Sequence, residues 1–477
     1  MTQDITHIKP PATVHLIGIC GTGMGALAGL LKQSGYNVTG SDAGAYPPMS
    51  NELNRLGIPI FEGYAAKNLE HNPDLVVIGN VCRSNHIEAV TAKEKGLLFA
   101  SFPQTLRQLF LRTRTPYVIT GTHGKTTTTS LLAFLLEKCG VDPGVLVGGI
   151  TKDFGAGYKL GKGEPFVVEG DEYDSAFFEK TAKFLAYAPK AAVITSVEHD
   201  HIDIYPDRES YFDAFRQFAE LVHPGPLAIY TGDAGCREIL DTSQLNSNVI
   251  TYGVTGDPFL FEPAWLANPR GPHRFTLTIE GIQHGKWETP LAGAHNLRNT
   301  LAALILAHQG AGIPLEELKA ALPQFGGVAR RQQIIGTPNN ITIYDDFAHH
   351  PTAVRVTLEA LKSEHPTSKI IAAFEPRSAT ACRKVHQQQY STAFNDADLA
   401  LIAPVGRDLP DDEALDTIQL SKAIIKNGIR AIATDSIAHL QALVEKEVAP
   451  GDVVVLFSNG SFGGLHQKLN DALASDK

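Results

Sequence analysis

The sequence predicts an α/β protein of three domains, in which mostly parallel sheets are flanked by helices. Short apolar runs that are typical of buried strands alternate with helix-like segments along most of the 477 residues. Two of the predicted strands run into glycine-rich loops, which begin at Gly18 and Gly121. Alternation of this kind favours βαβ units and parallel sheets. At about 150 residues per domain, the length accommodates three domains.

The first predicted domain spans residues 1–113 and is Rossmann-like. Its strands are expected at residues 14–19, 37–39, 75–78 and 97–100, and its first helix at residues 24–33. Gly21, Gly23 and Ala26 fit the fingerprint of a dinucleotide-binding turn, and Asp42 follows at the distance where an acidic residue binds ribose. NAD and UDP-sugars both carry a pyrophosphate, so this pattern alone also fits an NAD-dependent oxidoreductase. The residues expected to bind the pyrophosphate ligand are Gly18, Gly21, Thr22, Gly23, Met24, Ser41 and Asp42.

The second predicted domain spans residues 114–327 and begins with a phosphate-binding loop of the P-loop type. An apolar strand ends at Gly121, and Gly124 and Lys125 open an apolar helix. Glycines let backbone N–H groups approach phosphate oxygens, and the helix dipole adds partial positive charge. Lys125 is expected to reach a β- or γ-phosphate and Thr126 to ligate magnesium. The loop has two residues between its glycines where the usual P-loop has four. The expected phosphate-binding residues are Gly121, Thr122, His123, Gly124, Lys125, Thr126 and Thr127.

Polar residues follow two later strands of this domain and predict a metal site. Glu169 ends the strand at residues 166–169, and several carboxylates follow it within a few residues. Magnesium prefers oxygen ligands, so we expect Glu169 to bind it opposite the phosphate loop, with a solvated acidic loop as the alternative. His201 lies in a cluster of acidic and histidine residues after the strand at 191–195. It is a candidate to bind a second magnesium ion or to position a phosphate-bearing intermediate.

In the rest of the second domain, the sequence predicts an antiparallel insertion and a helix that contacts the nucleotide. Residues 257–288 alternate in polarity and predict a hairpin near Gly281. Asn296 and Asn299 lie three residues apart near the start of a helix, so their amides can pair with adenine edges. Helix capping by asparagine remains the alternative. Residues 325–328 contain two glycines and predict a hinge.

The third predicted domain spans residues 328–477 and is a second Rossmann-like α/β unit. Strands are expected at residues 341–344, 370–374, 399–402 and 453–457. Beside the hinge, Arg331 is expected to clamp phosphate and Asp346 to hold ribose hydroxyls. Arg377 ends a strand and is a candidate for binding a substrate carboxylate.

Composition excludes several other classes of protein. The net charge of −10 argues against a general binder of nucleic acid or anionic membranes. The five cysteines are scattered without a C-x-x-C pair, which is typical of free thiols in a reducing compartment. We find no signal peptide and no apolar run of the ~20 residues that a membrane span needs. We therefore expect a cytoplasmic protein.

These motifs, in this order and over nearly the whole chain, resemble the Mur ligase family of ATP-dependent amide-bond ligases in peptidoglycan metabolism. The resemblance implies that ATP and Mg²⁺ are required and that Lys125, Glu169 and His201 are catalytic. It further implies that Thr126, Glu169 and His201 surround the metal. His349, Arg377 and Ser378 would contact the peptide substrate.

The N-terminal glycines and the His349-His350-Pro351-Thr352 segment resemble the branch that acts on UDP-N-acetylmuramate. Segments 41–50, 171–178 and 458–469 resemble the ligases of this branch that reattach a recycled tripeptide, L-alanyl-γ-D-glutamyl-meso-diaminopimelate. In such an enzyme ATP phosphorylates the lactyl carboxylate, and the peptide amine then attacks the acyl phosphate. The alternatives are an L-alanine-adding ligase of the same branch and, outside the family, a non-catalytic nucleotide-binding module. The oligomeric state, monomer or homodimer, is left open.

Overall fold

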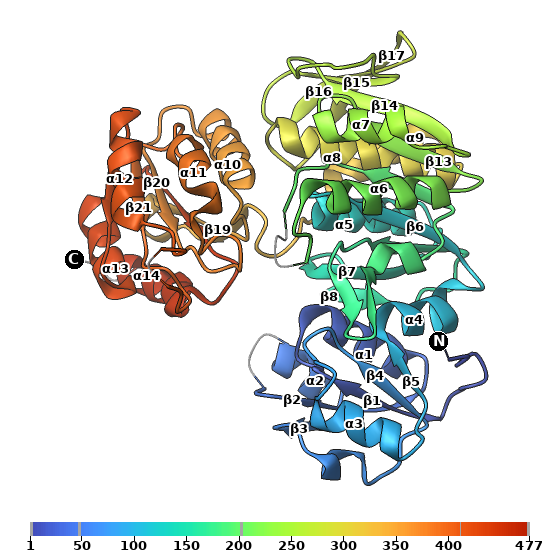
Figure 1. Cartoon of the computed structure of the whole chain (residues 1–477). Helices are drawn as coiled ribbons and strands as arrows, with labels where there is room; N and C mark the ends of the chain where they lie inside the picture. Colours follow the sequence, from blue (N-terminus) through green and yellow to red (C-terminus); the bar gives the residue numbers. More distant parts are fainter. Residues whose placement is uncertain (1–2, 46–48, 201–203, 411, 475–477) are drawn as a thin grey trace.

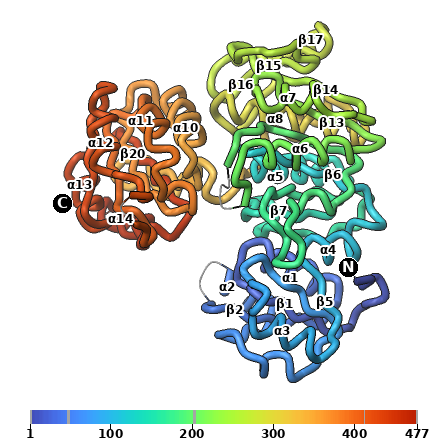
Figure 2. Tube along the Cα trace, viewed as in Figure 1, coloured from blue at the N-terminus to red at the C-terminus, as the bar shows by residue number. Residues whose placement is uncertain are grey.

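A computed structural model describes residues 3–45, 49–200, 204–410 and 412–474 and shows three α/β domains in chain order (Figures 1 and 2). The N-terminal domain is drawn in blue, the central domain in cyan to yellow and the C-terminal domain in orange to red. The predicted fold class is therefore confirmed. Within the described ranges, no helix is long and apolar enough to cross a membrane.

The N-terminal domain contains a five-stranded parallel sheet with the order β3-β2-β1-β4-β5. Because the chain runs outward from β1 to β3 and then continues on the other side of β1, the switch point lies between β1 and β4. The first glycine loop follows β1, at the place where α/β sheets bind ligands. The elements are β1 (Thr13–Ile17), α1 (Thr22–Gln33), β2 (Asn37–Asp42), α2 (Met49–Arg55), β3 (Ile60–Glu62), β4 (Leu75–Ile78), α3 (Ile87–Glu94), β5 (Phe99–Ser101) and α4 (Phe102–Leu106).

The central domain contains a ten-stranded sheet with the order β17-β16-β15-β14-β13-β12-β6-β9-β7-β8. β16 and β17 are antiparallel and turn at Glu280 and Gly281, whose φ angles are 47° and 79°, so the predicted hairpin is confirmed. The segment is a continuation of the main sheet and not a separate insertion, because β15 pairs parallel to β14. The strands are β6 (Thr115–Thr120), β7 (Gly144–Thr151), β8 (Ala156–Lys159), β9 (Pro165–Glu169), β12 (Ala191–Ile194), β13 (Pro226–Tyr230), β14 (Asn248–Val254), β15 (Trp265–Pro269), β16 (Arg274–Ile279) and β17 (Ile282–Glu288).

The helices of the central domain lie on both faces of this sheet (Figure 1). They are α5 (Lys125–Lys138), α6 (Arg208–Leu221), α7 (Ala234–Thr242), α8 (Ala294–Ile305) and α9 (Leu315–Ala321), and a short hairpin of β10 (Asp174–Ala176) and β11 (Glu179–Ala182) projects from the sheet. α5 packs along α8. This contact places the start of α8 beside the phosphate loop.

The C-terminal domain has a six-stranded sheet with the order β18-β19-β23-β20-β21-β22, in which only β18 is antiparallel to its neighbour. The elements are β18 (Gln333–Gly336), β19 (Thr342–Asp346), α10 (Pro351–Glu364), β20 (Ile370–Phe374), α11 (Gln387–Ala393), β21 (Leu399–Ile402), α12 (Thr417–Lys426), β22 (Arg430–Ala433), α13 (Ile437–Glu447), β23 (Val453–Phe457) and α14 (Leu465–Ala474). The four strands predicted from the sequence are confirmed.

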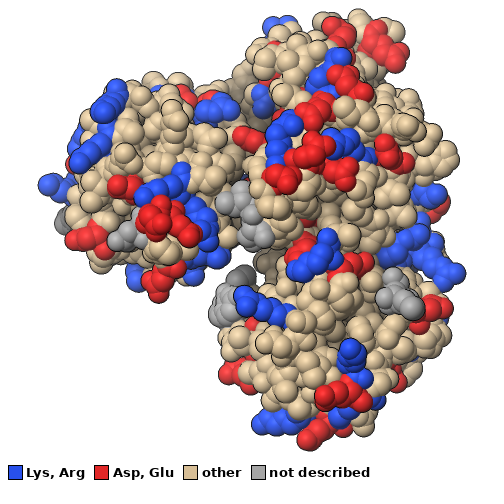
Figure 3. All heavy atoms as spheres, viewed as in Figure 1, with Lys and Arg blue, Asp and Glu red and all other residues tan. Residues whose placement is uncertain are grey.

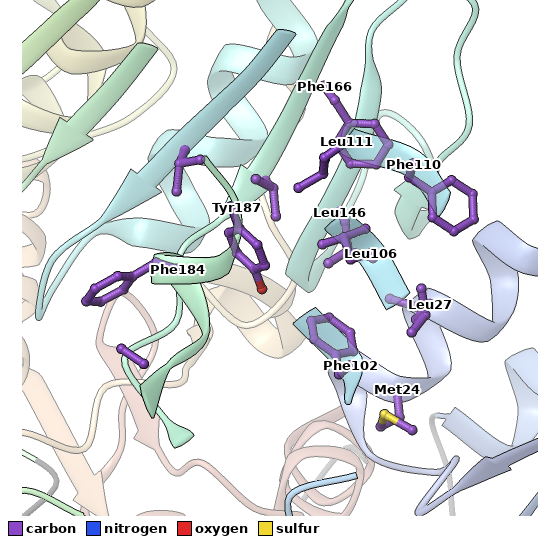
Figure 4. Packing of buried hydrophobic residues seen from close by; sticks show 14 of the residues in the cluster. Met24, Leu27, Phe102, Leu106, Phe110, Leu111, Leu146, Phe166, Phe184 and Tyr187 are labelled. Carbon is purple, nitrogen blue, oxygen red and sulfur yellow. The ribbon is translucent and has the colours of Figure 1, made fainter. Parts of the chain in front are cut away.

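One hydrophobic core joins the N-terminal and central domains. Met24 and Leu27 of α1 and Phe102 of α4 belong to the same buried cluster as Leu146 and Phe166 of the central sheet (Figure 4). The two hydrophobic clusters of the C-terminal sheet, by contrast, contain only residues from 341 onward. Burial of apolar surface therefore fixes the first two domains to each other, whereas the C-terminal sheet buries its apolar residues in clusters of its own.

Candidate active site

The phosphate loop connects β6 to α5 in a backbone conformation that requires glycine. Gly121 and Gly124 have φ angles of 127° and 83°, in the region that side chains disfavour. A Cβ atom on Gly124 would also lie 2.3 Å from Asn299 Oδ1. The loop is fastened to the end of β12, because Thr122 N donates to Ser196 O at 2.9 Å. The loop thus leads directly into the N-terminus of α5, and its binding of phosphate stays a prediction.

Lys125 is held by a buried carboxylate that the sequence did not single out. Its Nζ lies 2.8 and 2.7 Å from the two Glu172 oxygens and 2.7 Å from Gly121 O. The Glu172 side chain is fully buried. Burial lowers the pKa of Lys125, but the charges of Glu172 and Asp171 outweigh it and raise the pKa above its usual value. Lys125 therefore stays a cation at the phosphate loop.

Thr126 and Glu169, two of the three predicted magnesium ligands, lie together. Thr126 Oγ1 donates to Glu169 Oε1 at 3.0 Å, and Gly148 N donates to Glu169 Oε2 at 2.8 Å. Burial raises the pKa of Glu169, although Lys125 and Arg331 act in the opposite direction. A hydroxyl beside a carboxylate that its surroundings do not fully neutralise fits a hard divalent cation. The third predicted ligand, His201, lies outside the described residues.

A cavity of about 190 Å³ lies between the phosphate loop, α8 and the start of the C-terminal domain. Asn299 Nδ2 donates to Asn296 Oδ1 at 3.2 Å, so both amides face this space from one side of α8. Tyr230 and Tyr252 contribute aromatic surface. The predicted residues that line it are His123, Gly124, Thr126, Thr127, Asn296, Asn299, Arg331 and Asp346.

Asp346 and Arg331 reach this cavity from the C-terminal side of the predicted hinge at residues 325–328. Asp346 accepts hydrogen bonds from the backbone N–H groups of Gln332 and Ala348, each at 2.8 Å. Burial raises the pKa of Asp346 despite these bonds and the nearby Arg331. Arg331 Nη2 lies 3.4 Å from Thr126 Oγ1. The C-terminal domain thus completes the nucleotide cavity.

A second cavity of about 420 Å³ is lined by all three domains. Thr22 and Gly23 come from the first glycine loop, and Lys125 and Glu169 from the central domain. The C-terminal domain contributes His349, Ser378 and Asn459. Residues of the phosphate loop line both cavities, so a nucleotide phosphate bound there faces the second cavity.

Five residues predicted at the pyrophosphate site, Gly18, Gly21, Met24, Ser41 and Asp42, do not line either of these two cavities. Ser41 is fully buried, and its hydroxyl donates to Glu88 at 2.5 Å. Asp42 accepts a hydrogen bond from Cys20 N at 2.8 Å. The Asp42 side chain and the Ser41 backbone carbonyl, which accepts from Gly18 N and Ile19 N, hold the glycine loop, and contact of Ser41 and Asp42 with a ligand stays a prediction.

Arg377 lies beside the three-domain cavity but does not line it. Its guanidinium is 3.4 Å from Glu375 Oε1, and a Cβ on Gly460 would lie 2.3 Å from its Cδ. Gly460 therefore makes room for the arginine side chain. The neighbouring Ser378 does line the cavity.

Sequence reasoning missed several residues that the fold brings to the site. Glu172 pairs with Lys125, and Lys183 Nζ binds Asp171 Oδ2 at 2.7 Å within the three-domain cavity. Gln332 Nε2 lies 3.2 Å from His295 Nε2. The dense carboxylates after β9 indicated an acidic site, but only the tertiary structure shows which lysine each carboxylate meets.

Comparison with known proteins agrees with this arrangement. Residues 13–114 match the model described as Mur ligase family, catalytic domain, residues 119–307 match the Mur ligase middle domain, and residues 330–460 match the Mur ligase glutamate ligase domain. The chain is 36% identical over 466 residues, 97% of this chain and 98% of the relative, to UDP-N-acetylmuramate–L-alanyl-γ-D-glutamyl-meso-2,6-diaminoheptandioate ligase of Escherichia coli (strain K12).

Two further comparisons bear on the branch of the family. The chain is 36% identical over 399 residues, 83% of each chain, to UDP-N-acetylmuramate–L-alanine ligase of Syntrophomonas wolfei. Among solved structures, a murein peptide ligase from Psychrobacter arcticus 273-4 superposes with a TM-score of 0.73 at 31% identity, covering 98% of this chain and 99% of that one.

The three-domain fold around a phosphate loop, shared over the full length with proteins named as ligases, defines an ATP-dependent ligase that forms amide bonds. This class decides against the oxidoreductase and the non-catalytic interpretations of the sequence. The chain belongs to the Mur ligase family.

Proposed function

We propose that this ligase joins L-alanyl-γ-D-glutamyl-meso-diaminopimelate to UDP-N-acetylmuramate, with conversion of ATP to ADP and phosphate, in peptidoglycan recycling. The observation that carries the proposal is the cavity of about 420 Å³ to which all three domains contribute side chains. A reaction with three substrates needs such a meeting point. Full-length similarity to two ligases named for this tripeptide supports the choice of amine.

ATP would occupy the nucleotide cavity, with its adenine beside Asn296 and Asn299 and its ribose near Asp346. Its phosphates would lie on residues 121–127 at the N-terminus of α5. Lys125 and Arg331 would stabilise the negative charge on the transferred phosphoryl group. Magnesium, held by Thr126 and Glu169, would neutralise phosphate charge. His201 remains a proposed participant.

Thr22 and Gly23 would hold the pyrophosphate of the UDP-sugar at the N-terminus of α1, so that the lactyl carboxylate enters the three-domain cavity. The carboxylate oxygen attacks the γ-phosphorus of ATP, and ADP leaves. The peptide amine then attacks the acyl carbon, the tetrahedral intermediate expels phosphate, and the amine loses a proton. Closure of the C-terminal domain would keep water away from the acyl phosphate.

The amine substrate would be presented by the C-terminal domain through His349, Ser378 and Asn459, with Arg377 at the edge of the cavity. A tripeptide brings several carboxylates, which favour such cationic and N–H donors. The competing proposal is addition of free L-alanine. It draws on the relative from Syntrophomonas wolfei, which is equally identical to this chain over a shorter length.

A side-by-side phosphate-release assay separates the two. UDP-N-acetylmuramate and ATP are held constant, and the tripeptide or L-alanine is added at the same concentration, with an amine-free reaction as the control for uncoupled ATP hydrolysis. We expect the tripeptide to react at least about tenfold faster, a difference of roughly 1.4 kcal/mol in transition-state binding. A faster reaction with L-alanine would assign the chain to the biosynthetic branch.

A further inference from the structure

Two histidines and a glutamate converge where the phosphate loop meets the C-terminal domain. His123 belongs to the loop itself, Glu198 follows β12, and His350 caps the N-terminus of α10. One ligating atom from each of these three side chains lies within 4.8 Å of the other two. Three sequence segments from two domains thus bring two imidazoles and a carboxylate to one point.

His350 has a buried ring nitrogen whose hydrogen bonding the surrounding residues do not satisfy. Its side chain is 5% exposed. Nδ1 accepts a hydrogen bond from Thr352 N at 3.3 Å, which leaves Nε2 buried and without a hydrogen-bond partner. Buried polar atoms are seldom left unpaired, and those that are call for a ligand or a functional reason.

The other two residues are already oriented toward this point. His123 Nε2 lies 2.9 Å from Glu198 Oε2, and Thr352 Oγ1 donates to both Glu198 oxygens at 3.2 Å. The His123 and His350 rings are 4.9 Å apart between centroids. Tetrahedral zinc with ligand distances of about 2.0 Å needs ligand atoms roughly 3.3 Å apart. The three atoms lie within 4.8 Å of one another, so ligation requires any pair to approach by at most about 1.5 Å.

The protonation states also suit a metal. Burial raises the pKa of Glu198, but the contacts with His123, His350 and Thr352 outweigh it and lower the pKa to about 2. Burial lowers the pKa of His350 to about 3. The carboxylate is therefore charged and the His350 imidazole neutral at neutral pH, which are the forms that bind metals.

We propose that His123, Glu198 and His350 form a second metal site, which binds a borderline transition-metal cation such as Zn²⁺ and ties the phosphate loop to the C-terminal domain. Imidazole nitrogens favour zinc, cobalt or nickel, whereas the oxygen donors Thr126 and Glu169 favour magnesium. The two sites therefore differ in the cation they select. Three protein ligands leave a fourth position for water. The proposal does not depend on the identity of the amine substrate.

Cobalt(II) tests the site, because its visible absorption distinguishes tetrahedral from octahedral coordination. The full-length, untagged protein is treated with chelator, supplied with excess Mg²⁺ to occupy oxygen sites, and titrated with Co²⁺. We expect one equivalent of a tetrahedral species that Zn²⁺ displaces. A wild-type protein with no tetrahedral species would overturn the proposal.

His350→Asn is the matched variant, because asparagine is a good helix N-cap and preserves the start of α10 while removing the imidazole. We expect its affinity for Co²⁺ to fall on the order of 100-fold or more. His71→Asn is the control, since His71 is also paired with a histidine ring, at 5.6 Å from His15, but lies in the N-terminal domain. It should bind Co²⁺ as the wild type does.

Thermal unfolding supplies a second readout that also checks folding. A cation that binds only the folded state raises the melting temperature. Zn²⁺ should raise the melting temperature of the wild type and of His71→Asn, but not that of His350→Asn. Equal tetrahedral absorption in wild type and His350→Asn would exclude His350 as a ligand and the site as proposed.

Discussion

At the scale of single residues, Lys125 illustrates how a binding residue also supports the fold. The sequence alone predicts that replacing this loop lysine leaves the fold intact, since a loop lysine contributes little packing. The structure instead pairs it with Glu172, whose side chain is fully buried. Removing one partner of a buried ion pair leaves an uncompensated charge, which costs about 3–5 kcal/mol.

We therefore expect Lys125→Met to abolish ADP formation and also to lower the denaturant midpoint of the protein. Lys125→Met combined with Glu172→Gln should recover most of the lost stability, because no buried charge remains, yet still form no ADP. Urea unfolding followed by circular dichroism, together with an ADP assay, measures both effects. Equal stability of Lys125→Met and wild type would show that Glu172 does not need its partner.

Glu169 allows a test of the magnesium assignment. Glu169→Gln keeps the size of the side chain and one acceptor oxygen, which can still accept from Gly148 N, but removes the charge. We therefore expect the half-saturating Mg²⁺ concentration to rise at least about tenfold. Initial rates over a Mg²⁺ series measure this. A half-saturating concentration equal to that of the wild type would remove Glu169 from the metal site.

The pH dependence follows from the same carboxyl group. Burial raises the pKa of Glu169, so protonation begins at a higher pH than for a solvated glutamate. Because a protonated carboxyl binds Mg²⁺ poorly, the wild-type Mg²⁺ requirement should increase as the pH falls toward this raised pKa. Glu169→Gln has no such proton to gain, and its Mg²⁺ requirement should change less over the same range.

At the scale of elements, the start of α8 carries a pH-sensitive group. Burial lowers the pKa of His295 from 6.5 to about 3, and the Arg298 guanidinium acts in the same direction. A helix N-terminus also disfavours a positive charge. Between these two pH values the unfolded chain binds a proton that the folded chain does not, so stability falls as the pH falls.

We expect His295→Gln to lose less stability than the wild type when the pH is lowered from 6.5 toward 3. The difference should be at most about 1.4 kcal/mol for each pH unit. Urea unfolding at a series of pH values measures it. Parallel stability profiles for the two proteins would mean that His295 is solvated in the folded state.

At the same scale, the structure shows which helices and strands the pattern of apolar residues in the sequence predicts correctly. The strand at residues 75–78 is found at those limits as β4, and the helix expected near His295 begins at Ala294 as α8. The boundary expected at residues 113/114 lies just before β6, which starts at Thr115. Pro116 is the second residue of β6, and proline is tolerated near the beginning of a strand. Pairing partners were not predictable, since the parallel pairing of β14 with β15 depends on a register that local sequence does not encode.

At the scale of the whole molecule, two adjacent arginines just after the predicted hinge contact different domains. Arg330 donates to Ser458 O at 2.6 Å and to Gly460 O at 2.8 Å and pairs with Asp345 at 3.2 Å, all within the C-terminal domain. Arg331 points the other way and lies 3.4 Å from Thr126 Oγ1 in the central domain. Arg330 thus supports its own domain, whereas Arg331 contacts the phosphate loop of the central domain.

We expect Arg331→Ala to lower kcat by about 10²–10³-fold, as for loss of one donor to a developing charge, with a smaller effect on the KM for ATP. Arg331→Lys should be intermediate, because it keeps the charge but loses the planar fork. Arg330→Ala is the matched neighbour and should mainly lower the melting temperature. Steady-state kinetics and thermal unfolding of the three variants separate the roles, and a selective rise in KM for Arg331→Ala would contradict a role in phosphoryl transfer.

The composition of the site was predictable in part. Lys125, Thr126 and Glu169 could be identified because a glycine loop and the end of a strand are recognisable from a few neighbouring residues. The fold brings these three residues together. Glu172, Gln332 and Lys183 could not, because their roles depend on which distant side chain they meet. The limits of the domains, expected at residues 113/114 and 327/328, stay a prediction. Figure 3 shows why surface charge gives little help, since acidic and basic side chains are interspersed on the face it presents.

The β15–β17 edge of the central sheet determines what the tryptophan fluorescence of the protein reports. The chain has two tryptophans, and both lie there, Trp265 on β15 and Trp287 on β17, each no more than 2% exposed. The N-terminal and C-terminal domains have none. Tryptophan fluorescence therefore reports on one end of one sheet, while circular dichroism sums over all three domains. Disagreement between the two signals during unfolding would reveal the order in which the domains come apart.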